Sequence, residues 1–169
     1  MNSLIFNTVN ESKKKEIKII FNEKDFNIGF FSFPILEILS EDLEQVILNK
    51  ALAAYKKCMV PVVVEHGALK IESLKGLPGA LSKPIWDILG KDICNLIYPR
   101  ENRNAIACSA VCYCDGKTRK HFISCTKGSI SETSRGTNGF QWDPIFIPDG
   151  AKKTYAEMEL EEKLSFSQA

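Results

Sequence analysis

The chain has 169 residues, of which 44% are hydrophobic and 25% charged, and its 22 basic and 21 acidic side chains leave a net charge of +1. These ordinary globular values exclude disordered and collagen-like proteins, and they leave no basic region that would attract nucleic acid or an anionic membrane. No apolar run reaches the ~18 residues of a membrane-spanning helix, and the first residues are too short in apolar length for a signal peptide. We therefore expect a cytoplasmic protein of one domain.

Strand and helix patterns alternate along the first half of the chain. In chain order the sequence predicts a strand at 4–8, a helix that Asn10 caps, a strand at 26–33, a helix that Ser40 caps, a strand at 61–65, a helix over 85–97, and a hairpin at 105–126 that turns at Asp115-Gly116. Residues 61–65 are an unbroken β-branched run, which is typical of a central strand covered on both faces. The alternation, with a hairpin late in the chain, favours an α/β fold with a mixed sheet.

Six cysteines are many for a cytoplasmic chain. Cys108, Cys112 and Cys114 are separated by even numbers of residues, so in a strand their side chains lie on the same face. Cys125 lies on the returning strand of the predicted hairpin. Because no second Cys-x-x-Cys pair completes four ligands, we expect reduced thiols that pack as small hydrophobic groups. A metal site from Cys112, Cys114 and Cys125 and a regulatory disulfide are the alternatives.

A polar turn and a basic helix start follow the first strand. Thr8 and Asn10 precede Lys13, Lys14 and Lys15, although the helix dipole favours negative charge in a first turn. Backbone N–H groups, side-chain donors and ammonium groups that converge at a helix start can bind phosphate. The alternative is a solvated lysine cluster on a surface helix.

Three further polar residues interrupt apolar patterns. Lys50 lies on the apolar stripe of its helix, where it points either into a cleft or, by snorkelling, to the edge. Glu37 ends an apolar stretch, and Glu65-His66 ends the central strand. Carboxylates at strand ends beside a phosphate site suit a hard divalent cation, whereas ordinary solvated strand ends are the alternative.

Several motifs occur in a fixed order: Thr8-Val9-Asn10-Glu11-Ser12-Lys13, then Glu37-Ile38 ahead of Lys50, Val64-Glu65-His66, Gly76-Leu77-Pro78-Gly79, Phe140-Gln141-Trp142-Asp143-Pro144-Ile145-Phe146, and Thr154-Tyr155-Ala156-Glu157-Met158 ahead of Glu162-Lys163. Together they resemble the inosine triphosphate pyrophosphatase family, whose members hydrolyse noncanonical purine nucleoside triphosphates to the monophosphate and pyrophosphate. The resemblance covers nearly the whole chain.

The resemblance implies a role for each matching position. The triphosphate would be held by Thr8, Asn10, Lys13 and Lys50, Mg²⁺ (or Mn²⁺) by Glu37 and His66, and the purine by Phe140, Trp142, Asp143, Lys163, Ser167 and Gln168, with His66 and Lys50 as the catalytic residues. The family fold implies an elongated mixed sheet in two lobes, with the nucleotide in the cleft between them. It also implies a homodimer with one domain over residues 1–169.

This chain departs from the family motifs at several positions. His66 stands where the family has aspartate, Gln141 where it has glycine, and Ser167-Gln168-Ala169 where it has Ser-His-Arg. The chain also ends where the family continues into a terminal helix, which we expect to be lacking. We expect weak or altered pyrophosphatase activity with poor base selectivity, and a catalytically inactive nucleotide-binding relative is the alternative.

Overall fold

The computed structural model of the chain describes residues 3–22, 27–98 and 101–167. They form two compact units, of which the first combines residues 1–66 with 110–123 and the second combines residues 67–109 with 124–169. Three long strands contribute to both units: β3 (Val62–Ile71), β5 (Asn104–Cys114) and β6 (Arg119–Ile130). Neither unit is therefore a continuous stretch of sequence.

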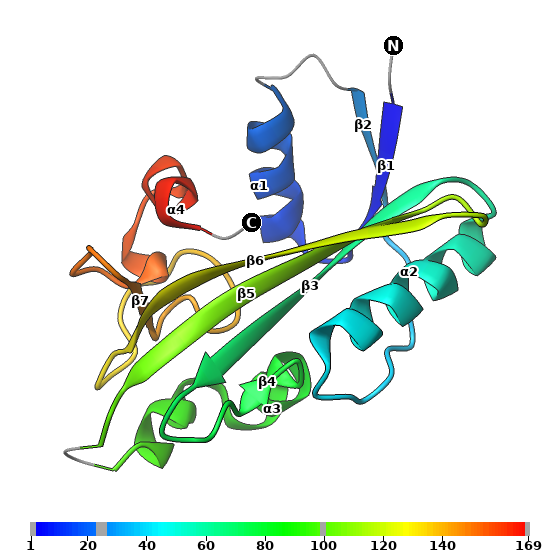
Figure 1. Cartoon of the computed structure of the whole chain (residues 1–169). Helices are drawn as coiled ribbons and strands as arrows, with labels where there is room; N and C mark the ends of the chain where they lie inside the picture. Colours follow the sequence, from blue (N-terminus) through cyan, green and yellow to red (C-terminus); the bar gives the residue numbers. More distant parts are fainter. Residues whose placement is uncertain (1–2, 23–26, 99–100, 168–169) are drawn as a thin grey trace. The chain divides into compact units, whose positions relative to one another are not determined.

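The described strands form one mixed sheet in the order β2-β1-β3-β5-β6-β7, with β4 paired to β3 (Figure 1). The shorter strands are β1 (Ser3–Asn7), β2 (Asn27–Phe31), β4 (Pro78–Gly79) and β7 (Phe146–Pro148). Strand β1 runs parallel to β2 and to β3, where Phe6 lies opposite Val63, whereas β3–β4 and β6–β7 are antiparallel. The expected α/β class is confirmed, but the strand predicted at 61–65 continues to Ile71, so Glu65 and His66 lie within β3 and not at its end.

In the first unit, helix α1 (Glu11–Asn22) begins where the sequence predicted. The side-chain oxygen of Asn10 accepts hydrogen bonds from the N–H groups of Ser12 and Lys13, at 2.9 and 3.2 Å. These bonds satisfy two of the donors that a helix start leaves unpaired. Asn10 is therefore the cap of α1.

Helix α2 (Leu43–Cys58) begins two residues later than Ser40 would allow, so the predicted cap is wrong. Asp42 caps it, because its carboxylate accepts the N–H groups of Glu44 and Gln45. The Ser40 hydroxyl instead accepts the N–H of Asp42, which forms a turn just before the helix.

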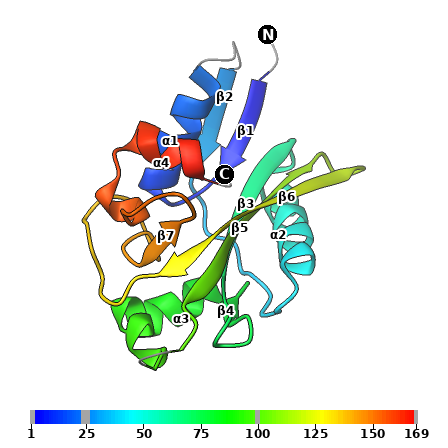
Figure 2. The ribbon, with the colours of Figure 1, turned by 60° about the vertical axis from the view of Figure 1, so that its left-hand side comes forward.

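Helices α1 and α2 lie on opposite faces of the sheet in the first unit (Figures 1 and 2). Side chains of consecutive strand residues alternate between the faces. Accordingly, Glu65 of β3 contacts Lys13 of α1, whereas His66 lies on the α2 side with Glu37. The face of α2 that is buried carries Leu43, Val46, Ile47, Ala51 and Ala54.

In the second unit, helix α3 (Ser82–Leu89) is followed by the 3₁₀ helix η1 (Gly90–Leu96). The single helix predicted over 85–97 is therefore wrong. Gly90 has φ +53° and ψ −132°, a backbone conformation that favours glycine and breaks the α-helix, and its N–H bonds to the Trp86 carbonyl. Periodicity alone did not reveal this break, because the apolar spacing continues across it.

The core of the second unit joins the sheet to the last part of the chain. It includes Leu69, Ile71, Ile93, Ala107, Ile130, Trp142, Ile145, Phe146, Tyr155 and Met158, all at most 5% exposed. The chain then forms the 3₁₀ turn η2 (Tyr155–Glu157) and helix α4 (Leu160–Phe166). None of the described helices is long and apolar enough to cross a membrane.

The connection between β5 and β6 is longer than the predicted two-residue turn at Asp115-Gly116. It comprises residues 115–118, and the Asp115 carboxylate accepts the N–H groups of Lys117 and Thr118 at 2.9 and 2.7 Å. An aspartate that hydrogen-bonds the backbone two residues later builds such a turn by itself.

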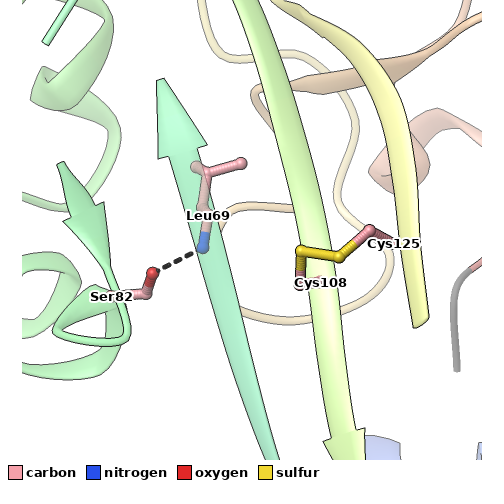
Figure 3. Close-up of a disulfide and its surroundings, with 4 residues drawn as sticks. All are labelled: Leu69, Ser82, Cys108 and Cys125. Atoms are coloured by element: carbon pink, nitrogen blue, oxygen red, sulfur yellow. Dashed lines mark hydrogen bonds between the residues drawn. A yellow bond between two sulfur atoms is a disulfide. The ribbon is translucent and has the colours of Figure 1, made fainter. Parts of the chain in front are cut away.

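The cysteines differ from the expected set of reduced thiols. Cys108 of β5 and Cys125 of β6 form a disulfide, which Figure 3 shows beside the Leu69–Ser82 hydrogen bond. The free thiols are Cys58, Cys94, Cys112 and Cys114. Because Cys125 is bonded to Cys108, the metal site from Cys112, Cys114 and Cys125 is also wrong.

Candidate functional site

In the first unit, one carboxylate is held between two nitrogen groups. Oε1 of Glu37 lies 2.7 Å from Nζ of Lys50, and its Oε2 lies 3.0 Å from Nδ1 of His66. The exposed fractions of the three side chains are 25%, 16% and 7%. Three residues that the sequence singled out separately therefore form one cluster.

Each member of the cluster comes from a different element. Lys50 projects from α2 and His66 from β3, and Glu37 lies on the segment that connects β2 to α2. That segment is fixed because the amide of Asn7 bonds to both the N–H and the carbonyl of Phe33. The ammonium of Lys57 also donates to the Pro34 carbonyl at 3.1 Å.

The neighbours of Glu37 keep its carboxylate ionised. Burial raises the pKa of this carboxyl, but the hydrogen bond from His66 and the charge of Lys50 outweigh burial and lower the pKa from 4.5 to about 2. Glu37 is therefore a carboxylate throughout the physiological pH range.

We expect Glu37 to stabilise the fold above pH 4.5. Because its folded-state pKa is lower than its unfolded value, this contribution is lost as pH falls from 4.5 to about 2. A shift of this size corresponds to at most about 3 kcal/mol, and roughly half should remain at pH 3. Urea unfolding of wild type and Glu37→Gln at pH 7 and pH 3 measures it. The matched control is Glu41→Gln, at an exposed position, and equal losses in both variants would contradict the assignment.

Residues that were predicted to bind phosphate lie at the start of α1. The Thr8 hydroxyl accepts the N–H of Asn10 at 3.2 Å, and Asn10 caps the helix. The ammonium of Lys13 forms an ion pair with Glu65 in a half-buried position. Lys14 pairs with Glu11 at 2.6 Å, and Lys15 is exposed. Of the three lysines, only Lys15 is therefore the solvated surface lysine of the alternative interpretation.

In the second unit, a buried ion pair organises the turn before β7. Nζ of Lys163 lies 2.8 Å from Oδ2 of Asp143, and both side chains are at most 7% exposed. The same oxygen accepts the N–H of Phe140 at 2.8 Å, and the Lys163 ammonium lies 4.9 Å from the centroid of the Phe140 ring. Asp143 and Lys163 therefore fix the position of Phe140.

The other predicted purine contacts have different environments. Phe140 is half-buried, whereas Trp142 is 5% exposed and belongs to the core. Ser167 follows α4 and donates its N–H to the Lys163 carbonyl at 2.9 Å. Gln168 lies outside the described residues. A role of Trp142 as a wall of the purine pocket stays a prediction.

Replacing Gly139 should disrupt this ion pair. Gly139 has φ +78°, and an added Cβ would lie 2.0 Å from Oδ2 of Asp143. We expect Gly139→Ala to cost about 3 kcal/mol in free energy of unfolding, because breaking a buried pair adds to the backbone strain. Gly150 is the matched control, since its φ is +87° but its nearest atom lies 3.9 Å from the added Cβ. Gly150→Ala should cost about 1 kcal/mol in urea unfolding, and equal costs would contradict the prediction.

Sequence reasoning missed two partners in these clusters. Glu65 was considered only together with His66 at the predicted strand end, yet it lies on the other face of β3 and pairs with Lys13. The pairing of Asp143 with Lys163 was also unforeseen, although each residue was singled out. A buried lysine is rare without an acidic partner. If Lys163 had been predicted as buried, this rule would have called for a partner acid, and Asp143 is such an acid.

Comparison with known proteins decides the family. The family model of the Ham1 family matches residues 4–169. The chain is 38% identical over 161 residues to the dITP/XTP pyrophosphatase of Saccharolobus solfataricus, with 95% of this chain and 84% of that protein covered. The chain belongs to the Ham1 family. The resemblance stated from its motifs is thereby confirmed.

Further members of the Ham1 family agree with this assignment. The inosine triphosphate pyrophosphatase of Saccharomyces cerevisiae is 35% identical over 178 residues, with 98% of this chain and 89% of that protein covered. A HAM1 protein from Coxiella burnetii superposes with a TM-score of 0.83 at 22% identity, with 99% of this chain and 92% of that chain covered. The last comparison supports the Ham1 fold alone.

Proposed function

We propose that the protein hydrolyses noncanonical purine nucleoside triphosphates to the monophosphate and pyrophosphate. The observation that carries the proposal is the Glu37 carboxylate held between Lys50 and His66 in a member of the Ham1 family. Relatives named dITP/XTP pyrophosphatase and inosine triphosphate pyrophosphatase support the substrate class.

In this proposal the start of α1 binds phosphate. The ammonium of Lys13, which also pairs with Glu65, supplies positive charge there, and the positive end of the α1 dipole adds to it. The ammonium of Lys50 supplies a second charge from α2. Charge neutralisation around a transferring phosphoryl group is usually the largest catalytic contribution.

We propose Mg²⁺, with Mn²⁺ as a substitute, as the cofactor. Mg²⁺ prefers hard oxygen ligands and is commonly held by one or two carboxylates together with substrate phosphates. Glu37 fits, because it is ionised down to about pH 2. The described residues contain no group of three or more metal-ligating side chains, so triphosphate oxygens would supply most of the coordination. Bound there, the cation would neutralise phosphate charge, with His66 oriented beside it by Glu37.

We propose that the Phe140 ring stacks on the purine. Lys163 and Asp143 would hold this ring in place, and Trp142, Ser167 and Gln168 would complete the base side. A flat aromatic face binds every base, so stacking alone does not distinguish purines.

The proposal is tested by measuring pyrophosphate release from dITP, XTP, ITP and ATP with Mg²⁺ and with Mn²⁺. We expect release of pyrophosphate together with the nucleoside monophosphate from at least one noncanonical purine nucleotide. Nucleotide binding without product would favour the alternative, an inactive nucleotide-binding relative. Release of orthophosphate in place of pyrophosphate would contradict the proposed reaction.

Base selectivity is expected to be poor. The positions of the family's base-reading histidine and arginine are Gln168 and Ala169, and alanine offers no side-chain hydrogen bond. We expect the Kd values of ITP and ATP to differ by less than about tenfold, or ~1.4 kcal/mol. Titration calorimetry measures both constants, and a hundredfold preference for ITP would refute the expectation.

We also propose a homodimer that works in the cytoplasm, since both are expected from the family resemblance. Light scattering of the purified protein would give twice the mass of 19.0 kDa for a dimer. A monomeric mass at micromolar concentration would contradict it.

A further inference from the structure

The disulfide between β5 and β6 has no role in the proposed hydrolysis. Cys108 and Cys125 have Cα atoms 4.1 Å apart, close to the spacing of directly opposite residues in an antiparallel pair. Cys108 is 2% exposed, whereas Cys125 is exposed. One sulfur-bearing residue of the bond is therefore open to an attacking thiol.

The remaining thiols are poorly suited to exchange with this bond. Cys94, Cys112 and Cys114 are buried, and burial raises the pKa of the Cys94 thiol and raises that of Cys112 to about 11. A thiol reacts as the thiolate, so Cys94 and Cys112 are inert at neutral pH, and burial shields Cys114 from a reductant. The Cys58 thiol is half-buried and hydrogen-bonds to the Val60 carbonyl. The three buried thiols are thus shielded from exchange with the Cys108–Cys125 bond, and Cys58 serves as the control thiol below.

The bond closes off one structural segment. Cys108 and Cys125 both belong to the second unit, and the residues between them include the whole hairpin segment, 110–123, which belongs to the first unit. The disulfide therefore fixes both strands of the hairpin beside the points where they enter the first unit.

Within the first unit, this hairpin contacts the helix that carries Lys50. A Cβ at Gly116 would lie 2.3 Å from the ring of Tyr55, so the turn lies directly against α2. Nε2 of His121 also lies 3.5 Å from a carboxylate oxygen of Glu44 on α2. Figure 2 shows α2 alongside these strands. Because the hairpin packs against α2, loosening the hairpin should also loosen α2, the helix that carries Lys50.

We propose that the Cys108–Cys125 disulfide is a redox switch, through which a dithiol reductant loosens the hairpin and α2 and lowers pyrophosphatase activity. The expected loss of pyrophosphatase activity rests on the proposed function. A thiolate of the reductant attacks Sγ of Cys125, the S–S bond breaks, and Sγ of Cys108 leaves with the electron pair and takes a proton. The second thiol of the reductant then attacks the mixed disulfide and releases Cys125 as a thiol. The protein gains two thiols and the reductant becomes a cyclic disulfide.

The test compares the oxidised and dithiol-reduced full chain by thiol titration, thermal unfolding, amide hydrogen exchange and pyrophosphate release. Reduction should expose two further thiols and lower Tm by about 5–15 °C, because it removes a cross-link around a 17-residue separation. Exchange should accelerate in residues 110–123 and in α2, and kcat should fall at least about threefold. Reoxidation should restore all four values.

Two variants provide the controls. Cys125→Ser should resemble the reduced protein and no longer respond to the reductant, whereas Cys58→Ser should respond like wild type. Three outcomes would each overturn the switch. The dithiol could fail to reduce the bond, the oxidised protein could contain six free thiols, or reduction could leave the amide hydrogen exchange of α2 unchanged. If the oxidised protein releases no pyrophosphate, the proposed function fails, and the exchange of α2 still decides on the switch.

Discussion

Replacing His66 with aspartate is expected to raise the pyrophosphatase rate with Mg²⁺ by roughly tenfold at saturating nucleotide, the range in which partners of metal ligands commonly act. Nδ1 of the His66 imidazole lies 3.0 Å from one oxygen of Glu37. An aspartate at this position would add a second hard carboxylate, which suits the preference of Mg²⁺ for oxygen. It would also release the Glu37 oxygen that His66 occupies.

The matched control is His66→Asn, which has nearly the size of aspartate without its charge. The three proteins are assayed with Mg²⁺ and Mn²⁺ between pH 6 and 9. Mn²⁺ tolerates nitrogen ligands better than Mg²⁺, so the gain from aspartate should be smaller with Mn²⁺. If His66→Asp lowers the rate under every condition, His66 is itself a catalytic group and the hypothesis of a weakened enzyme is wrong.

Lys50→Met is expected to lower kcat/KM by about 10²–10³-fold, the usual effect of removing one electrostatic group from a reacting centre. Lys50 is 16% exposed and lies 2.7 Å from Glu37, so its charge is only weakly screened by water. Methionine keeps the length and apolar character of the lysine stem, which should preserve α2.

Lys56→Met provides the control for Lys50→Met, because Lys56 lies on the same helix but is exposed. Its kcat/KM should stay within about twofold of wild type. Circular dichroism of both variants checks that α2 is retained. A comparable loss of activity in both variants would show that net charge, and not the position of Lys50, determines the rate.

Cap residues in the sequence predicted the start of α1 but not the start of α2. Asn10 caps α1 as predicted, and the hydroxyl of Thr8 accepts the Asn10 N–H in the turn before the helix. Before α2, Ser40 and Asp42 are both good caps, and the choice depends on the turn in which the Ser40 hydroxyl accepts the Asp42 N–H. A sequence cannot rank two cap residues that stand two positions apart when the geometry of the preceding chain decides between them.

Contacts between distant residues were less accessible from the sequence. Lys50 on the apolar stripe of α2 and Glu37 at the end of an apolar stretch were singled out because each breaks a local pattern. The Cys108–Cys125 bond depends on the register of two strands, which parity arguments for a single strand do not fix. The pair Lys13–Glu65 joins residues 52 positions apart, and only the packing of α1 against β3 brings them together.

The interleaving of the two units in sequence limits how this protein can exchange parts with its relatives. The first unit needs residues 110–123 from the middle of the second, where Cys112 and Cys114 are buried. A single recombination point after residue 66 would join the first segment of one relative to the hairpin of another, and mismatched side chains would then meet at α2. Exchange of the first unit without the second requires three crossovers, so substitutions in α2 and in the hairpin should be selected together.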